Sequence, residues 1–244
     1  MAEINQKAPE KKEIKEEDFK INLEEINQAG LSLGHRTSKT HPKMKEYICG
    51  ARNDIHIIDV EKTAQKFNEA LSFIKNLISE NKILLLVGTK IQAKKLVGET
   101  ASQLGLPYVN ERWLGGTFTN FGTIKKRIEY FKDLKKKRES GELEKYTKKE
   151  RANIDKELQD LENKFGGIKD LEKLPDAIFV LDMRKDFLAI REAAKKKITI
   201  IAIADTNVDP TLADYPIPAN DDAIPSIKYI LEKVKEAVLK AKAK

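Results

Sequence analysis

The amino-acid sequence predicts an α/β protein: a parallel sheet with helices on both faces, interrupted by an inserted antiparallel α-hairpin that protrudes from it. Two observations predict the sheet. Short apolar runs alternate with amphipathic helical segments in residues 55–116, and the same alternation returns after residue 171. A third observation predicts the hairpin, because residues 117–170 contain no strand-like run and carry two narrow apolar seams.

The chain begins with a segment that has few apolar residues. Residues 1–22 alternate acids and bases, which predicts a charged, disordered tail. We expect the sheet domain to comprise residues 23–116 and 171–244, with the hairpin at 117–170. Residues 30–54 look irregular, because glycine, proline and bases are mixed there. Between positions 35 and 52 the basic residues face a single acid, Glu46, which favours a loop turned towards an anion over an ordinary solvated loop. These bases are Arg36, Lys39, Lys43, Lys45 and Arg52.

The first half of the sheet domain supplies apolar runs with helices between them. Residues 55–59 open the alternation, and the helix that follows has apolar positions at the helical period as far as Ile78. Residues 82–88 form an apolar run, as expected of a strand buried on both faces. Thr89 is a suitable N-cap for the next helix, and residues 107–110 offer a further strand.

The second half of the sheet domain repeats this pattern. Residues 176–182 and 198–205 are predicted strands, separated by a helix at 187–197. Residues 215–218 are limited to the edge of a sheet, because their two prolines cannot donate to a central ladder. Residues 221–244 form a closing helix, with lysines in its last turns where they complement the helix dipole.

The inserted hairpin is predicted from two apolar seams with heptad-like spacing, which indicates an antiparallel coiled coil. One seam consists of Ile124, Ile128, Phe131 and Leu134, and the other consists of Ile154, Leu158, Leu161 and Phe165. Residues 139–147 form the turn between the helices, and Gly166 and Gly167 end the second helix. A seam this narrow buries little surface, so we expect a contact outside the chain to steady the hairpin.

The composition favours an anionic partner. The 244 residues carry a formal net charge of +7 and a pI of about 9.1, which suits nucleic acid, although a soluble enzyme can also be basic. One cysteine, Cys49, cannot form an internal disulfide and indicates a reducing compartment. There is no stretch like a signal peptide, and no apolar run approaches the roughly 18 residues that span a bilayer. We expect a cytoplasmic protein without membrane contact.

Motifs for catalysis are weak. The sequence has no G-x-G-x-x-G after a strand, no G-x-S-x-G, and no promising pairing of cysteine with histidine. "VGTK" at 87–90 places a glycine and a lysine after a strand without completing a phosphate loop. An α/β enzyme that binds a nucleotide or sugar phosphate at the strand edge is therefore the alternative function. A scaffold whose hairpin binds protein alone is a third possibility.

Aspartates gather where predicted strands end. Asp205 ends one strand, and Asp209, Asp221 and Asp222 lie in the loops that follow. Because the carboxyl ends of parallel strands share one edge, these acids could bind a cation together with a histidine. Asp and Asn also cap helices and form turns, which is the simpler interpretation of the residues taken alone.

Long stretches, in order and correctly spaced, resemble the bacterial type of small-subunit ribosomal protein two. They are "GHRTSKTHPKM", "YICGARNDIHIIDVEKT", "VGTK", "YVNERWLGGTFTNFGTI", "GGIKDLEKLPDAIFVLD", "AIADTNVDP" and "IPANDDAI", and the similarity runs from about residue 23 to about 238. The resemblance implies a Rossmann- or flavodoxin-like sheet domain with a protruding coiled-coil hairpin. It also implies a structural, non-catalytic role on the small ribosomal subunit. The partners would be small-subunit ribosomal RNA and other ribosomal proteins, including the large RNA-binding protein one, with no small-molecule substrate.

This resemblance gives residues 112–127 a role. The segment joins the sheet to the hairpin, and Gly115 and Gly116 permit a sharp backbone path or the close approach of a phosphate. Besides the five bases of the 35–52 segment, we expect RNA contacts from Arg112, Trp113, Thr117, Asn120, Lys125 and Arg127. Trp113 can instead pack the joint between the two parts, and the whole segment can be a hinge plug.

The resemblance also implies a divalent ion at the acidic edge. The matching ligands are His35, Asp205, Asp221 and Asp222. Such an ion, Zn²⁺ or Mg²⁺, would be structural, and no cofactor is required for the implied function. The family often has a further histidine where Ser32 stands, so this position departs from the pattern.

Overall fold

The computed structural model describes Phe19 and residues 21–243. The predicted tail, residues 1–22, therefore lies almost entirely outside the described part of the chain. Phe19 is an exception. Its side chain is buried in the main core, where Lys75 and Lys240 lie over the ring at 5.9 and 4.6 Å from its centroid. α1 (Leu23–Gln28) follows, with Asn22 as its N-cap.

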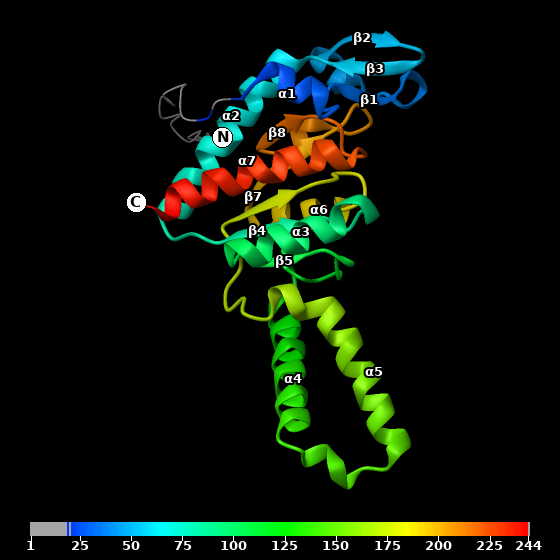
Figure 1. Ribbon diagram of the computed structural model, residues 1–244, viewed down its shortest axis with the longest axis vertical. Helices are drawn as coiled ribbons and strands as arrows, with labels where there is room; N and C mark the ends of the chain where they lie inside the picture. Colours follow the sequence, from blue (N-terminus) through cyan, green and yellow to red (C-terminus); the bar gives the residue numbers. More distant parts are fainter. Residues whose placement is uncertain (1–18, 20, 244) are drawn as a thin grey trace, which may run out of the picture.

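A five-stranded parallel sheet forms the centre of the molecule (Figure 1). Its order is β5-β4-β6-β7-β8, and every neighbouring pair is parallel. The strands are β4 (Leu84–Val87), β5 (Tyr108–Val109), β6 (Ala177–Val180), β7 (Thr199–Ala204) and β8 (Tyr215–Pro218). The predicted parallel sheet is confirmed, and the proline-containing β8 lies at its edge as expected.

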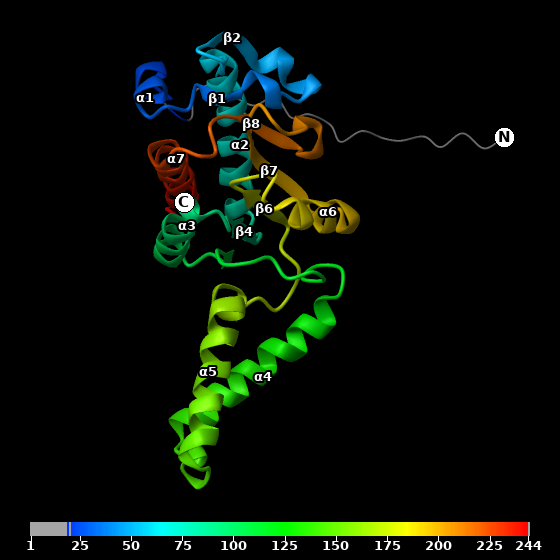
Figure 2. The same ribbon diagram turned by 90° about the vertical axis from the view of Figure 1, so that its right-hand side faces the viewer.

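Helices cover both faces of this sheet. One face carries α2 (Val60–Ser79), α3 (Ile91–Leu104) and α7 (Ile224–Lys242), and the other carries α6 (Phe187–Lys196), as Figure 2 shows. Each face of the sheet has its own hydrophobic core, and successive side chains of a strand point into the two cores alternately. Leu84 and Leu86 lie in the core under α2, α3 and α7, whereas Leu85 and Val87 lie in the core under α6. The apolar runs are uninterrupted because both faces are buried.

A second sheet corrects the prediction for residues 30–59. It is small and antiparallel, with the order β1-β3-β2. Its strands are β1 (Leu33–Arg36), β2 (Ile48–Arg52) and β3 (Ile55–Ile58), with two 3₁₀ turns, Thr37–Lys39 and Pro42–Tyr47, between β1 and β2. Residues 55–59 were expected to open the parallel alternation, which is wrong. Asn53 and Asp54, both at positive φ, instead form a two-residue turn that pairs β2 with β3.

The helical hairpin protrudes from the side of the parallel sheet that lies opposite the small antiparallel sheet (Figure 1). It consists of α4 (Phe121–Glu139), a 3₁₀ turn (Glu142–Lys145), α5 (Lys148–Phe165) and a closing 3₁₀ turn (Gly166–Ile168). The predicted seam residues are buried, apart from the partly buried Ile154. They are continuous with the core under α6, so the hairpin is anchored within the chain at its root.

Two predicted helix starts also need correction. Lys90, rather than Thr89, is the N-cap of α3, because Thr89 donates its backbone N–H and its hydroxyl to Asp186. The closing helix begins at Ile224, because Asn220 Oδ1 accepts hydrogen bonds from the N–H groups of Asp222 and Ala223 and holds them in a turn. In the described part of the chain, no helix is long and apolar enough to cross a membrane.

Candidate functional site

The acidic edge forms where β1 meets the carboxyl ends of the parallel strands. Asp205 follows β7, Asp221 follows β8, and His35 lies in β1. Thr206 holds β1 in place, because its hydroxyl accepts a hydrogen bond from the backbone N–H of His35 at 3.0 Å. Its carbonyl accepts another from His41 at 2.8 Å. The small sheet, which sequence reasoning missed, therefore delivers the histidine to the acids.

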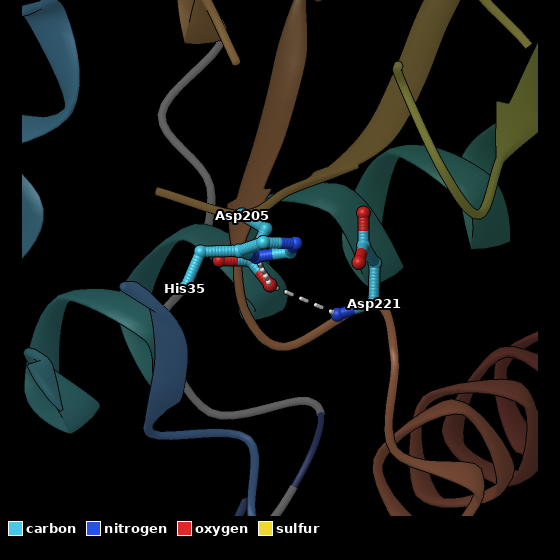
Figure 3. A group of neighbouring side chains, drawn as sticks. All are labelled: His35, Asp205 and Asp221. Atoms are coloured by element: carbon cyan, nitrogen blue, oxygen red, sulfur yellow. Dashed lines mark hydrogen bonds and ion pairs between the residues drawn. The ribbon is translucent and has the colours of Figure 1, made fainter. Parts of the chain in front are cut away.

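Three of the four predicted metal ligands converge there (Figure 3). One ligand atom from each of His35, Asp205 and Asp221 lies within 4.8 Å of the others. His35 Nδ1 is 3.1 Å from Asp205 Oδ2, yet this buried nitrogen has no hydrogen bond of acceptable geometry. An imidazole nitrogen and two buried carboxylates that converge in this way can hold a divalent ion, so these three residues fit one.

Asp222 takes a different position. Its side chain is half exposed, and its Oδ2 lies 3.3 Å from His35 Nε2. Its Oδ1 lies 2.7 Å from the Lys90 ammonium, which also lies 2.7 Å from Asp221 Oδ1 and 3.1 Å from Asp182 Oδ2. Sequence reasoning did not assign Lys90 to this cluster. Its place also weighs against a phosphate site at "VGTK", because the ammonium is already surrounded by carboxylates that would repel a phosphate.

Burial and mutual charge perturb the titration of this cluster. Burial, together with Asp182 and Asp205, raises the pKa of Asp221 to about 7, in spite of its contact with Lys90. Contact with the Asp205 carboxylate raises the pKa of His35. The Lys90 pKa is raised as well: burial alone would lower it, but the aspartates around the ammonium prevail. The cluster thus suits a positive charge, whether that charge is an ammonium, an imidazolium or a metal ion.

The predicted RNA-binding residues lie in two groups. Arg36, Lys39, Lys45 and Arg52 are exposed on the small sheet and its turns, and we call them the small-sheet surface. Arg112, Asn120, Lys125 and Arg127 are exposed at the hairpin root, and we call them the hairpin surface. Figure 1 shows the parallel sheet between these two regions, so they form separate surfaces of one molecule.

Three predicted RNA contacts have internal partners. Lys43 is half exposed, and its ammonium lies 2.8 Å from Asp209 Oδ2 and from Thr211 Oγ1. Thr117 is buried and donates its hydroxyl to the carbonyl of Leu114. Trp113 is also buried, and it packs edge-on against Phe118 with ring centroids 4.8 Å apart. The placement of Trp113 matches the alternative in which its ring packs the joint.

Glu192 is a further residue that the sequence analysis missed. It lies on α6 with only 6% of its surface exposed, and its carboxylate accepts hydrogen bonds from the joint that leads into α4. Burial would raise its pKa, but the N–H groups of that joint lower it overall, so Glu192 is ionised at neutral pH. The signal in the sequence was an acid beside Ala189 and Ala193 on the apolar face of a helix.

Comparisons with known proteins agree with this architecture. The family model described as "Ribosomal protein S2" matches residues 26–241. The curated "Small ribosomal subunit protein uS2" of Coprothermobacter proteolyticus is 45% identical over 222 residues, which is 91% of this chain and 83% of that protein. The protein of the same name from Dictyoglomus thermophilum is 47% identical over 222 residues, which is 91% of this chain and 90% of that protein.

Proposed function

This chain belongs to the ribosomal protein S2 family, and on that premise we propose that it binds small-subunit ribosomal RNA through the small-sheet surface and the hairpin surface. The protein is a structural constituent of the small ribosomal subunit and not an enzyme. The observation that carries the proposal is the placement of exposed basic side chains at both ends of the sheet domain, within a chain of net charge +7.

Phosphate contact explains why these residues are basic and exposed. Within the described residues, Lys39, Lys45 and Arg52 form no ion pair of the kind that holds Lys43 and Lys90. Folded RNA is recognised mainly through phosphates and ribose, so a protein that touches it in two places reads its shape rather than a short sequence. Asn120 adds an amide that can reach a ribose oxygen.

The residues with internal partners have an indirect role in this proposal. Lys43 ties the turn before β2 to the loop after β7 through Asp209. Trp113 and Thr117 hold the joint between the sheet and the hairpin. Their replacement would alter RNA binding through the position of the neighbouring contacts.

We further propose that His35, Asp205 and Asp221 hold a structural divalent cation. The convergence of the three ligand atoms, with the buried His35 nitrogen 3.1 Å from Asp205 Oδ2, supports this assignment. An imidazole ligand favours Zn²⁺ over Mg²⁺, which prefers oxygen ligands alone. Asp222, which also contacts Lys90, lies at the rim of this site.

The neighbouring proteins of the subunit are the second class of partner. We propose that the large RNA-binding protein one docks beside the acidic edge. Two apolar side chains at helix starts, Ile91 and Ile224, are 86% and 54% exposed; Ile91 follows Lys90 in the chain, and Ile224 follows Asp221 and Asp222. Protein interfaces combine an apolar centre with a polar rim, and apolar side chains beside a charged cluster suit that composition.

Matched double variants test the RNA proposal. Lys39→Gln with Arg52→Gln removes two charges from the small-sheet surface, and Lys125→Gln with Arg127→Gln removes two from the hairpin surface. We expect each pair to weaken binding to small subunits depleted of this protein by about tenfold or more at fixed salt. Lys95→Gln with Lys228→Gln removes two exposed charges from α3 and α7 and is the control. If all three pairs of substitutions changed the binding affinity equally, RNA binding through these two surfaces would be refuted.

A further inference from the structure

The joint between the sheet and the hairpin is built around one carboxylate. Glu192 Oε1 accepts hydrogen bonds from Gly116 N at 2.7 Å and, at the long limit of 3.4 Å, from Trp113 Nε1. Its Oε2 accepts from Phe118 N at 2.9 Å, and from the N–H and hydroxyl of Thr119 at 3.1 and 3.2 Å. Converging N–H groups of this kind form a nest that binds anions, and here the chain supplies the anion itself.

The conformation of the joint requires glycine at the centre of this nest. Gly116 has φ = +95°, a region that side chains rarely adopt, and this turns its N–H towards Glu192. Because the nest is filled from within, its N–H groups are not available to an RNA phosphate. This corrects one expectation for the paired glycines: the sharp backbone path is present, but a phosphate at Gly116 would have to displace a buried carboxylate.

The two ends of this interaction belong to different parts of the molecule. Glu192 lies on α6, whose Ala189, Ile190 and Ala193 are buried against the parallel sheet. The residues that it holds run directly into α4, which begins at Phe121. A buried carboxylate therefore connects the sheet domain to the segment that leads directly into the hairpin.

We propose that Glu192 is the positioning residue of the hairpin: its carboxylate fills the nest at 116–119 and fixes the direction in which α4 and α5 leave the sheet domain. The seam joins the two helices to each other and meets the core under α6 only at the root of the hairpin, so the direction of the hairpin depends on the contacts made at that root. The importance of this direction for RNA binding rests on the proposed function. The direction itself is a property of the free protein.

Distance measurement between two spin labels tests the proposal in the full chain. Cys49 is an exposed thiol and is replaced by serine, so that labels attach only at Lys149→Cys on α5 and Lys228→Cys on α7. We expect a narrow distance distribution with Glu192 present and a clearly broader one in Glu192→Ala. Glu99→Ala, which removes an exposed glutamate from α3, is the control and should leave the distribution narrow.

Chemical rescue separates this role from general damage to the fold. Glu192→Ala leaves an empty anion nest, so millimolar formate, but not the same concentration of formamide, should narrow the distribution again. Glu192→Gln keeps the size of the side chain and is the second variant if the alanine variant does not fold. Its amide replaces one acceptor with a donor that faces N–H groups, so the distribution should broaden as well. A distribution as narrow as that of the parent in the folded variants would overturn the proposal.

Measuring the binding to depleted small subunits distinguishes the positioning role of Glu192 from the proposed RNA contacts of the hairpin surface. If the hairpin surface contacts RNA, Glu192→Ala should bind about tenfold more weakly, because the contacts are no longer held in place before binding. A broadened distribution with unchanged binding would support the positioning role of Glu192 and contradict the hairpin contacts. A narrow distribution with weakened binding would overturn the positioning role instead.

Discussion

Single side chains in this protein often act through a partner far away in the chain. Lys43 was expected to face RNA, but its ammonium lies against Asp209. Lys90 was noted only as part of a weak phosphate motif, and its ammonium forms ion pairs with three aspartates. The sequence shows that both side chains are positively charged. The partner that receives the charge depends on the tertiary fold.

The Lys43–Asp209 pair has a testable pH dependence. Hydrogen bonds from Lys43 and Thr211 lower the pKa of Asp209 from 3.8 to about 2. A carboxylate with a lowered folded-state pKa stabilises the fold fully above its unfolded-state pKa, and this stabilisation is lost as the pH falls through the folded-state value. Because the pair is partly exposed, we expect Asp209→Asn to lower the melting temperature at pH 7 by at most about 2–4 °C.

The difference in melting temperature between the parent and Asp209→Asn should shrink steadily as the pH falls from 4 towards 2. Asp170→Asn, which removes a 79% exposed carboxylate, is the control and should change the melting temperature little at any pH. A difference that stays constant down to pH 2 would show that the Asp209 charge is not responsible.

The role of a residue could be predicted from the sequence where it depends on residues nearby in the chain. The exposed bases were predicted because several charged side chains in a segment with few apolar residues cannot all be buried. Asp205 and Asp221 were placed together because strand ends of a parallel sheet share one edge, whereas His35 was added through the family resemblance. Glu192 could not be assigned a role from the sequence, because its partners lie more than 70 positions earlier in the chain.

At the scale of elements, the return from the hairpin is fixed by a close approach. Gly167 follows α5, and a Cβ atom there would lie 2.2 Å from the carbonyl oxygen of Tyr108 in β5. No side chain fits without moving the backbone. Glu192 holds the residues that precede α4, and the approach at Gly167 holds the residues that follow α5. The hairpin is therefore supported at both of its ends.

We expect Gly167→Ala to destabilise the protein by about 1–3 kcal/mol, because the added methyl group must push β5 and the hairpin end apart. Gly122→Ala is the control, since Gly122 lies in α4 with no atom within 4 Å of the added Cβ. That change should stabilise the helix by about 0.5–1 kcal/mol. Urea unfolding measures both. An unchanged stability of Gly167→Ala would contradict a close approach at this position.

The seam of the hairpin makes a second prediction at this scale. Phe131 is 1% exposed between α4 and α5, so Phe131→Ala should cost about 3–5 kcal/mol. Hydrogen exchange should show the loss in the amides of α4 and α5 before those of β6 and β7. The neighbouring Tyr130→Ala, from a 42% exposed position, should have little effect. Equal loss of protection in the parallel sheet would contradict a hairpin that opens separately.

The sequence predicted the long elements better than the short ones. α2, α4, α5 and α7 are long and periodic, so their apolar spacing was sufficient. β1 and β2 were missed because glycine, histidine and arginine interrupt any alternation, and the pairing of β2 with β3 depends on a turn of two residues at positive φ. "RNDI" at 52–55 was the available signal, since Asn and Asp tolerate that conformation better than other residues.

At the scale of the whole molecule, the architecture separates two basic surfaces with a largely buried sheet whose strands carry no charged residue. The small sheet lies at one end and the hairpin at the other (Figure 1). The parallel sheet and the insertion were predicted, because alternation and its interruption are global features of the sequence. The distance between the surfaces could not be predicted, because it depends on the small sheet and on the direction of the hairpin.

The most direct test of the account is co-sedimentation of the protein with small ribosomal subunits depleted of their own copy, across a series of salt concentrations. The account predicts stoichiometric binding at low salt and an affinity that falls steeply as salt rises, by roughly 0.7–0.9 logarithmic units for each phosphate neutralised per tenfold increase in salt. Binding that does not change with salt, or no binding by the folded protein at low salt, would contradict recognition of ribosomal RNA through its backbone.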